Sequence, residues 1–90
     1  MLKKSFTKEF LITLDSVLEY SKVSGDKNPI HLDKEYASKT LFGRRIVHGA
    51  LLVGYISSVI ANDYPGKGSI LLNQEIKYLK PTFLNDKVKV

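Results

Sequence analysis

The 90-residue sequence contains no cysteine, so it can form neither disulfide bonds nor thiolate metal sites. This absence fits a reducing compartment, and we expect a cytoplasmic protein. The chain also lacks internal repeats, low-complexity tracts and a long linker, which predicts one domain over residues 1–90. Its first residues carry positive charge without an apolar run before Lys8 and Glu9, so we expect no signal peptide.

Long hydrophobic runs are also scarce. Residues 46–62 contain no Asp, Glu, Lys or Arg, but glycines, serines, a histidine and an asparagine interrupt them. A membrane span needs roughly 20 predominantly apolar residues. We therefore expect no membrane association.

The formal net charge is +5, from 14 basic and 9 acidic residues. The lysines are scattered, and no basic stripe with interleaved aromatic residues is present, so we expect no nucleic-acid partner. A chain this small buries only a modest core by itself, which favours oligomerisation.

The pattern of apolar residues predicts an α+β domain. Alternation predicts a first strand over residues 4–12 and another over residues 69–78, ended by Pro81. Val88 and Val90 predict the start of a further strand. Residues 47–61 are apolar on nearly every face, which predicts a central helix surrounded by other structure.

Two shorter helices are predicted from their N-caps. Thr13 or Asp15 is suited to cap a helix from Leu14 that ends before Gly25. Asp33 is suited to cap a short helix that ends near Gly43, and this role is favoured over a part in catalysis.

The chemistry is concentrated in a loop that reads Gly-Asp-Lys-Asn-Pro-Ile-His. It places the carboxylate of Asp26 five residues before the imidazole of His31, in a composition that favours an irregular turn. A second pair, His48-Gly49, opens the apolar helix, whose first backbone N–H groups are suited to bind an oxyanion. Acid, base and oxyanion donor are therefore all present.

This combination resembles the MaoC-like dehydratases, and within them the R-specific enoyl-CoA hydratases. The shared motifs are Gly-Asp-x-Asn-Pro-x-His, then Phe-Gly and Ile-Val-His-Gly, and the resemblance continues to Asp86-Lys87-Val88. It implies a hot-dog fold, in which an antiparallel sheet wraps around the long helix. Such domains carry several more strands, so the chain corresponds to the N-terminal two-thirds of a usual domain.

The resemblance also implies a hydro-lyase that reversibly adds water to trans-2-enoyl-CoA, giving R-3-hydroxyacyl-CoA. Asp26 and His31 would hold and activate the water, and the Gly49 N–H would bind the thioester oxygen. Neither a metal nor an organic cofactor is implied. The expected partners are the acyl-CoA substrate and a second copy of the chain in a homodimer.

Each site residue also has a plainer interpretation. Asp26 fits an Asx turn, His31 a half-buried loop histidine, and Asn28 a residue that shapes the loop. His48 is as well explained by a structural role, and Ser57 by a bond to a carbonyl one helical turn back. Arg44 and Arg45 suit coenzyme A phosphates but are also ordinary loop residues.

The sequence also bears on metal binding and on other classes of function. The spacing His31-x-Asp33 offers two metal ligands, but no third follows at a recognisable spacing, so we expect no metal. No Gly-x-Ser-x-Gly motif is present, which argues against a serine hydrolase. The remaining alternatives are a non-catalytic, partner-completed subunit or fragment that binds acyl thioesters, and a dehydratase for another acyl thioester.

Overall fold

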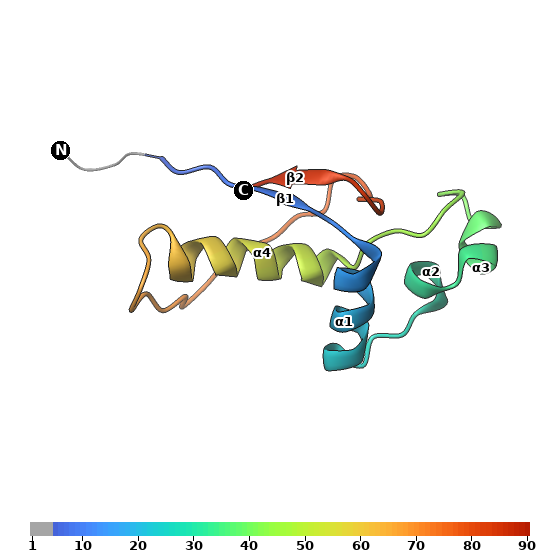
Figure 1. The fold of residues 1–90 in the computed structure, drawn as a ribbon, viewed down its shortest axis with the longest axis horizontal. Coiled ribbons are helices and arrows are strands. Elements are labelled where there is room, and N and C mark those ends of the chain that lie inside the picture. Colours follow the sequence, from blue (N-terminus) through green and yellow to red (C-terminus); the bar gives the residue numbers. More distant parts are fainter. Residues whose placement is uncertain (1–4) are drawn as a thin grey trace.

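The computed structural model describes residues 5–90, which form short strands and helices beside one long helix (Figure 1). This is the α+β composition that the sequence predicts. In chain order the elements are β1 (Glu9–Leu11), α1 (Leu14–Ser24), α2 (Pro29–Leu32), α3 (Lys34–Ser38), α4 (Gly49–Asn62) and β2 (Lys87–Lys89).

The sheet pairs the two ends of the described chain. β1 and β2 run antiparallel, with Phe10 opposite Val88. Backbone bonds between Lys8 and Val90 extend the ladder on one side. The predicted first strand is thus present but shorter than residues 4–12, of which Lys4 lies outside the described residues. The predicted strand near Val88 and Val90 is β2.

The core lies where this ribbon meets the helices. Ile12 and Val17 are fully buried, and Val47 is nearly so. The rings of Phe10 and Tyr55 pack with their centroids 4.6 Å apart, which joins β1 to α4. The inward face of the ribbon therefore rests on the long helix, close to the point where α1 begins (Figure 1).

Helix α1 has the start and end that its sequence favours. Of the two predicted N-caps, Thr13 is the one used, since its hydroxyl accepts a bond from the Ser16 N–H at 3.1 Å. Asp15 lies in the first turn, where a negative charge suits the helix dipole. The helix ends at Gly25, whose φ of 80° is left-handed and favours glycine.

Helix α3 is capped by Asp33, as predicted, through a 3.0 Å bond from the Tyr36 N–H to its carboxylate. Turns follow it up to Gly43. Helix α2 was not predicted, because the loop composition favoured an irregular turn. The available signal was Asn28 followed by Pro29, since asparagine suits an N-cap and proline the first helical position.

Helix α4 begins two residues later than predicted, because Val47 is still extended and its N–H bonds to the Thr82 carbonyl at 2.7 Å. Most of its apolar side chains are only partly covered, and of its residues only Val59 is buried. Among the described residues, no helix is both long enough and apolar enough to cross a membrane.

The predicted strand over residues 69–78 is not formed. Residues 70–81 are all exposed and belong to no ladder, although Figure 1 shows this segment returning along α4 toward β2. A strand needs a neighbour for its backbone groups, and in the part of the chain that the structure describes β1 and β2 pair only with each other. An alternating pattern indicates which face of a strand is apolar. It does not show whether a second strand is available to pair with it.

Candidate active site

The loop after α1 holds Asp26 through its backbone. The Asp26 N–H donates to the Ser24 hydroxyl at 3.1 Å, and the Asp26 carbonyl accepts from the Ser21 hydroxyl at 2.7 Å. Its carboxylate Oδ1 accepts from the Asn28 N–H at 3.3 Å, which is the Asx turn that the sequence allowed. This turn uses one oxygen, and the exposed Oδ2 remains available to a water molecule.

Asn28 and Pro29 then start α2 and so set the position of His31. The Asn28 Oδ1 accepts from the Ile30 N–H at 3.2 Å, which caps the helix. His31 follows in the same turn. Asn28 therefore shapes the loop through bonds from its side chain to the backbone.

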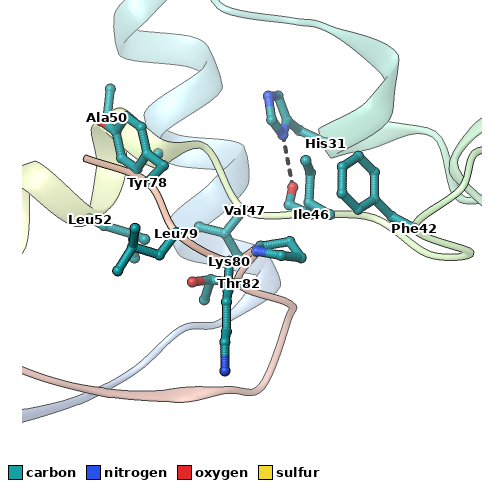
Figure 2. A pocket seen from close by; sticks show the side chains of 12 residues that line it. His31, Phe42, Ile46, Val47, Ala50, Leu52, Tyr78, Leu79, Lys80 and Thr82 are labelled. Carbon is teal, nitrogen blue, oxygen red and sulfur yellow. Dashed lines mark hydrogen bonds between the residues drawn. The ribbon is translucent and has the colours of Figure 1, made fainter. Parts of the chain in front are cut away.

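The His31 ring is fixed by a backbone carbonyl. Its Nδ1 lies 2.8 Å from the Ile46 oxygen (Figure 2). A carbonyl oxygen only accepts, so Nδ1 carries the proton and donates it. In the neutral ring, the other nitrogen, Nε2, has a lone pair and is able to accept a proton.

His48 is buried beside the His31 ring, with only 1% of its surface exposed. Its Nε2–H donates to the Asp26 carbonyl at 3.1 Å, while its buried Nδ1 has no hydrogen-bond partner in the structure. The ring lies 3.9 Å from that of His31, with 31° between their planes, and meets the edge of Tyr20 at 4.8 Å. His48 thus connects the Asp26 loop, α2 and the start of α4.

The pKa of His48 is lowered from the ordinary value of 6.5. Burial is the main cause, because it disfavours the charged ring, and the neighbouring His31 acts in the same direction. The bond to the Asp26 carbonyl and the Asp26 charge oppose the shift without cancelling it. His48 is therefore held as a neutral ring.

One atom each from Asp26, His31 and His48 lies within 4.8 Å of the others. Local spacing in the sequence pointed to His31 and Asp33 as possible metal ligands. It did not indicate His48, which is contributed from a distant position. The geometry is poorly suited to a shared ion. An imidazole binds a metal in its own plane at about 2.0–2.1 Å, and two rings stacked so nearly parallel cannot both do so without turning.

A pocket of about 590 Å³ adjoins His31 and the first turn of α4. Its wall includes Phe42, Tyr78 and Leu79 (Figure 2). Gly49 also lines it. A methyl group on Gly49 would lie 2.7 Å from Tyr78 Cε1, so glycine is needed for the ring to sit this close. No pattern in the sequence indicated that Tyr78 and Leu79 would line this pocket.

The other candidate residues lie outside this cluster. Ser57 is exposed on α4 and does not line the pocket. The Arg44 guanidinium stacks 3.7 Å from the centre of the Phe83 ring. Arg45 donates to the Leu32 carbonyl at 3.4 Å. The structure thus brings together Asp26, His31, His48 and the start of α4, but neither Ser57 nor the two arginines.

Two solved structures that are similar to this chain are named hydratases. The chain superimposes on the (R)-hydratase of Aeromonas caviae involved in PHA biosynthesis with a TM-score of 0.89 and 37% identity, over 93% of this chain and 64% of that one. The unliganded R-hydratase PhaJ1 of Pseudomonas aeruginosa gives a TM-score of 0.87 and 39% identity, over 98% and 58%. The chain therefore has the hot-dog fold expected of it.

Within this fold class, the model of the family described as "MaoC like domain" matches residues 3–90. The chain therefore belongs to the MaoC-like domain family. It is 43% identical over 72 residues to an (R)-specific enoyl-CoA hydratase of Aeromonas caviae, which covers 80% of this chain and 54% of the relative. It is 37% identical over 79 residues to a 3-hydroxybutyryl-CoA dehydratase of Methylorubrum extorquens, covering 88% and 50%. The chain spans about half the length of these relatives.

Proposed function

We propose that the chain carries the catalytic residues of an R-specific enoyl-CoA hydratase, which reversibly adds water to trans-2-enoyl-CoA to give R-3-hydroxyacyl-CoA. The observation that carries the proposal is the bond from His31 Nδ1–H to the Ile46 carbonyl. It leaves Nε2 as a proton acceptor on a ring that has one nitrogen within 4.8 Å of an Asp26 carboxylate oxygen. The R configuration of the product rests on the relatives' names alone.

Hydration needs a water molecule to lose a proton as its oxygen bonds to the β-carbon. The electrons of the double bond then take up a proton at the α-carbon. Asp26 and His31 form a pair suited to these two transfers, because one accepts a proton while the other delivers one. Two groups that transfer protons and one oxyanion donor suffice for this addition, so the proposed mechanism uses neither a metal nor an organic cofactor.

Negative charge develops on the thioester oxygen during this addition. The Gly49 N–H begins α4, where the first N–H groups have no partner within the helix and the dipole favours negative charge. Gly49 and His31 line the same pocket, which supports binding of the thioester between them. The enoyl group would lie against Tyr78 and Leu79.

The working protein is proposed to be a cytoplasmic homodimer formed from single-domain chains. The large apolar side chains left exposed between residues 70 and 79 support association, since monomers rarely expose contiguous apolar surface. Ile70 is 80% exposed and Leu72 is 92% exposed.

The decisive experiment follows the loss of enoyl-thioester absorbance when crotonyl-CoA is mixed with the chain and, in parallel, with Asp26→Asn. The amide keeps the size of the carboxylate and its Oδ1 acceptor for the Asx turn but removes the charge. We expect turnover to fall by about 10²- to 10⁴-fold, with circular dichroism unchanged. Equal rates in the two proteins would refute the assignment.

A second candidate is a non-catalytic subunit that binds acyl thioesters and is completed by another chain. The same exposed apolar segment favours it, because a surface of this kind is normally covered. Solution mass and the sharpness of thermal unfolding distinguish the two. A monomer that unfolds without cooperativity and turns over no crotonyl-CoA supports the second candidate.

A further inference from the structure

Both arginines of the chain line one small pocket away from the His31 pocket. Arg44 and Arg45 share it with Lys34, Leu84 and Asn85. Its volume is about 210 Å³, below the roughly 300–1,000 Å³ of pockets that enclose whole small molecules. It therefore has room for a charged group of a larger ligand whose remainder lies on the surface.

Among residues 5–90, no ion pair neutralises these three cations. No carboxylate lies among the residues of this basic pocket. Within residues 5–90, the ion pairs are Lys8 with Asp63 and Lys39 with Glu35, so neither involves the basic pocket. Three like charges on residues that line one pocket repel one another, and a bound anion would reduce that repulsion.

The guanidinium groups are also held in place before any ligand arrives. The Arg44 Cζ lies 3.7 Å from the centre of the Phe83 ring, and Phe83 is itself held by a 2.9 Å bond from its N–H to the Asp86 carboxylate. Arg45 uses one Nη1–H on the Leu32 carbonyl, which leaves its other donors for a ligand. Such preorganised forks suit the oxygens of a phosphate group better than a lysine alone would.

The basic pocket is joined to the catalytic loop through the backbone. Arg45 precedes Ile46, whose carbonyl orients His31, and it bonds the carbonyl of Leu32, the residue after His31. A ligand that reaches both places must carry phosphate at one end and its reacting group at the other. Coenzyme A thioesters have this form, with a phosphate monoester and a diphosphate on the nucleotide.

We propose that Lys34, Arg44 and Arg45 form a phosphate subsite for the nucleotide end of coenzyme A. This inference rests on the proposed function in taking the ligand to be an acyl-CoA. It gives the two arginines a binding role and adds Lys34, the first residue of α3.

The test is calorimetric titration of the chain with free coenzyme A and with pantetheine, which lacks all the phosphates. Arg44→Ala is expected to weaken coenzyme A binding about tenfold and to leave pantetheine binding unchanged. Lys87→Ala, which removes an equally exposed charge from β2, is the matched control and should bind both as the unaltered chain does. Arg44→Lys should fall between, because it keeps the charge but loses the planar fork.

Wild-type affinity for coenzyme A in both Arg44→Ala and Lys34→Ala would overturn the inference. So would equal losses for coenzyme A and pantetheine, because the variant would then have damaged the fold and not a phosphate site. The readout does not depend on turnover. Phosphate-dependent binding without hydration of crotonyl-CoA would refute the proposed function while leaving the subsite supported.

Discussion

The fold treats two parts of the chain in opposite ways. The site segment, residues 24–49, holds its functional groups through short bonds from side chains to the backbone, such as His31 to Ile46 and His48 to Asp26. The extended segment, residues 69–80, has a clear apolar alternation but no ladder partner in the described chain. Hydrogen bonds within one continuous stretch of chain can therefore organise a site even where the sheet beside it is incomplete.

The largest effect is expected inside the site segment. His31→Ala removes the proton acceptor, so crotonyl-CoA hydration should fall by about 10²- to 10⁴-fold. Steady-state kinetics measure this loss, and thermal unfolding checks that the fold survives. Because His31 lies in a four-residue helix that Asn28 caps independently, we expect the fold to persist. Retained turnover would show that His31 is not the proton acceptor.

A second change tests the point where the two segments touch. In Gly49→Ala the new methyl would lie 2.7 Å from Tyr78 Cε1, so the exposed ring must move and the pocket wall with it. We expect kcat/KM to fall about tenfold. The free energy of unfolding should fall by no more than about 3 kcal/mol, because the ring can move.

The matched control is Gly54→Ala on the same helix, where a methyl group meets no atom within 4 Å. It should leave activity unchanged and stabilise the helix by about 1 kcal/mol. The coupling is read from a double-mutant cycle, in which Gly49→Ala should matter less once Tyr78 is already alanine. Strict additivity would mean that the two segments act independently.

The pH dependence of stability tests how His48 is held. Since burial lowers its pKa below 6.5, the unfolded chain binds this proton more tightly than the folded chain does. The free energy of unfolding should therefore fall as pH drops below about 6.5, and its contribution is fully present above that value. Urea unfolding at about pH 7.5 and about pH 5.5 measures the change, since these values lie on either side of the ordinary histidine pKa.

His48→Gln is the comparison variant for this measurement, because its amide can still donate to the Asp26 carbonyl but does not titrate. Its unfolding free energy should vary less between the two pH values. An identical variation in both proteins would assign the effect to other groups.

The smallest effect is expected in the extended segment. Leu72 is 92% exposed within one chain, so at protein concentrations where the chain is monomeric Leu72→Ser should change the free energy of unfolding by no more than about 0.5 kcal/mol. Ile12→Ala, at a fully buried position, should cost about 2–5 kcal/mol and sets the scale. A loss at Leu72 that approaches the loss at Ile12 would show that another surface covers the segment in solution.

The sequence predicted the features that depend on nearby residues. The caps at Thr13 and Asp33 act within three residues, and the Asp26 turn acts over two. The resemblance to the MaoC-like family was confirmed, and with it the hot-dog fold. That Asp26, His31 and Gly49 act in catalysis stays a prediction.

What the sequence left out depends on contacts between distant positions. The stack of His48 on His31 and the approach of Tyr78 to Gly49 join residues far apart in the chain, and no local pattern encodes them. The failed strand over residues 69–78 has the same origin, because alternation is a local property and pairing is not. Helix α2 is the exception, since Asn28-Pro29 was a local signal that was available.

The two imidazoles are both oriented by main-chain carbonyls, those of Asp26 and Ile46. Every residue type has such a carbonyl, so the proton positions on the rings do not depend on the side chains that line the substrate pocket. In the proposed enzyme, exchanges at Phe42, Tyr78 or Leu79 would therefore alter which acyl chain is accepted while the tautomers persist. In evolutionary terms, such a site would separate the chemistry from the choice of substrate, and each could change without rebuilding the other.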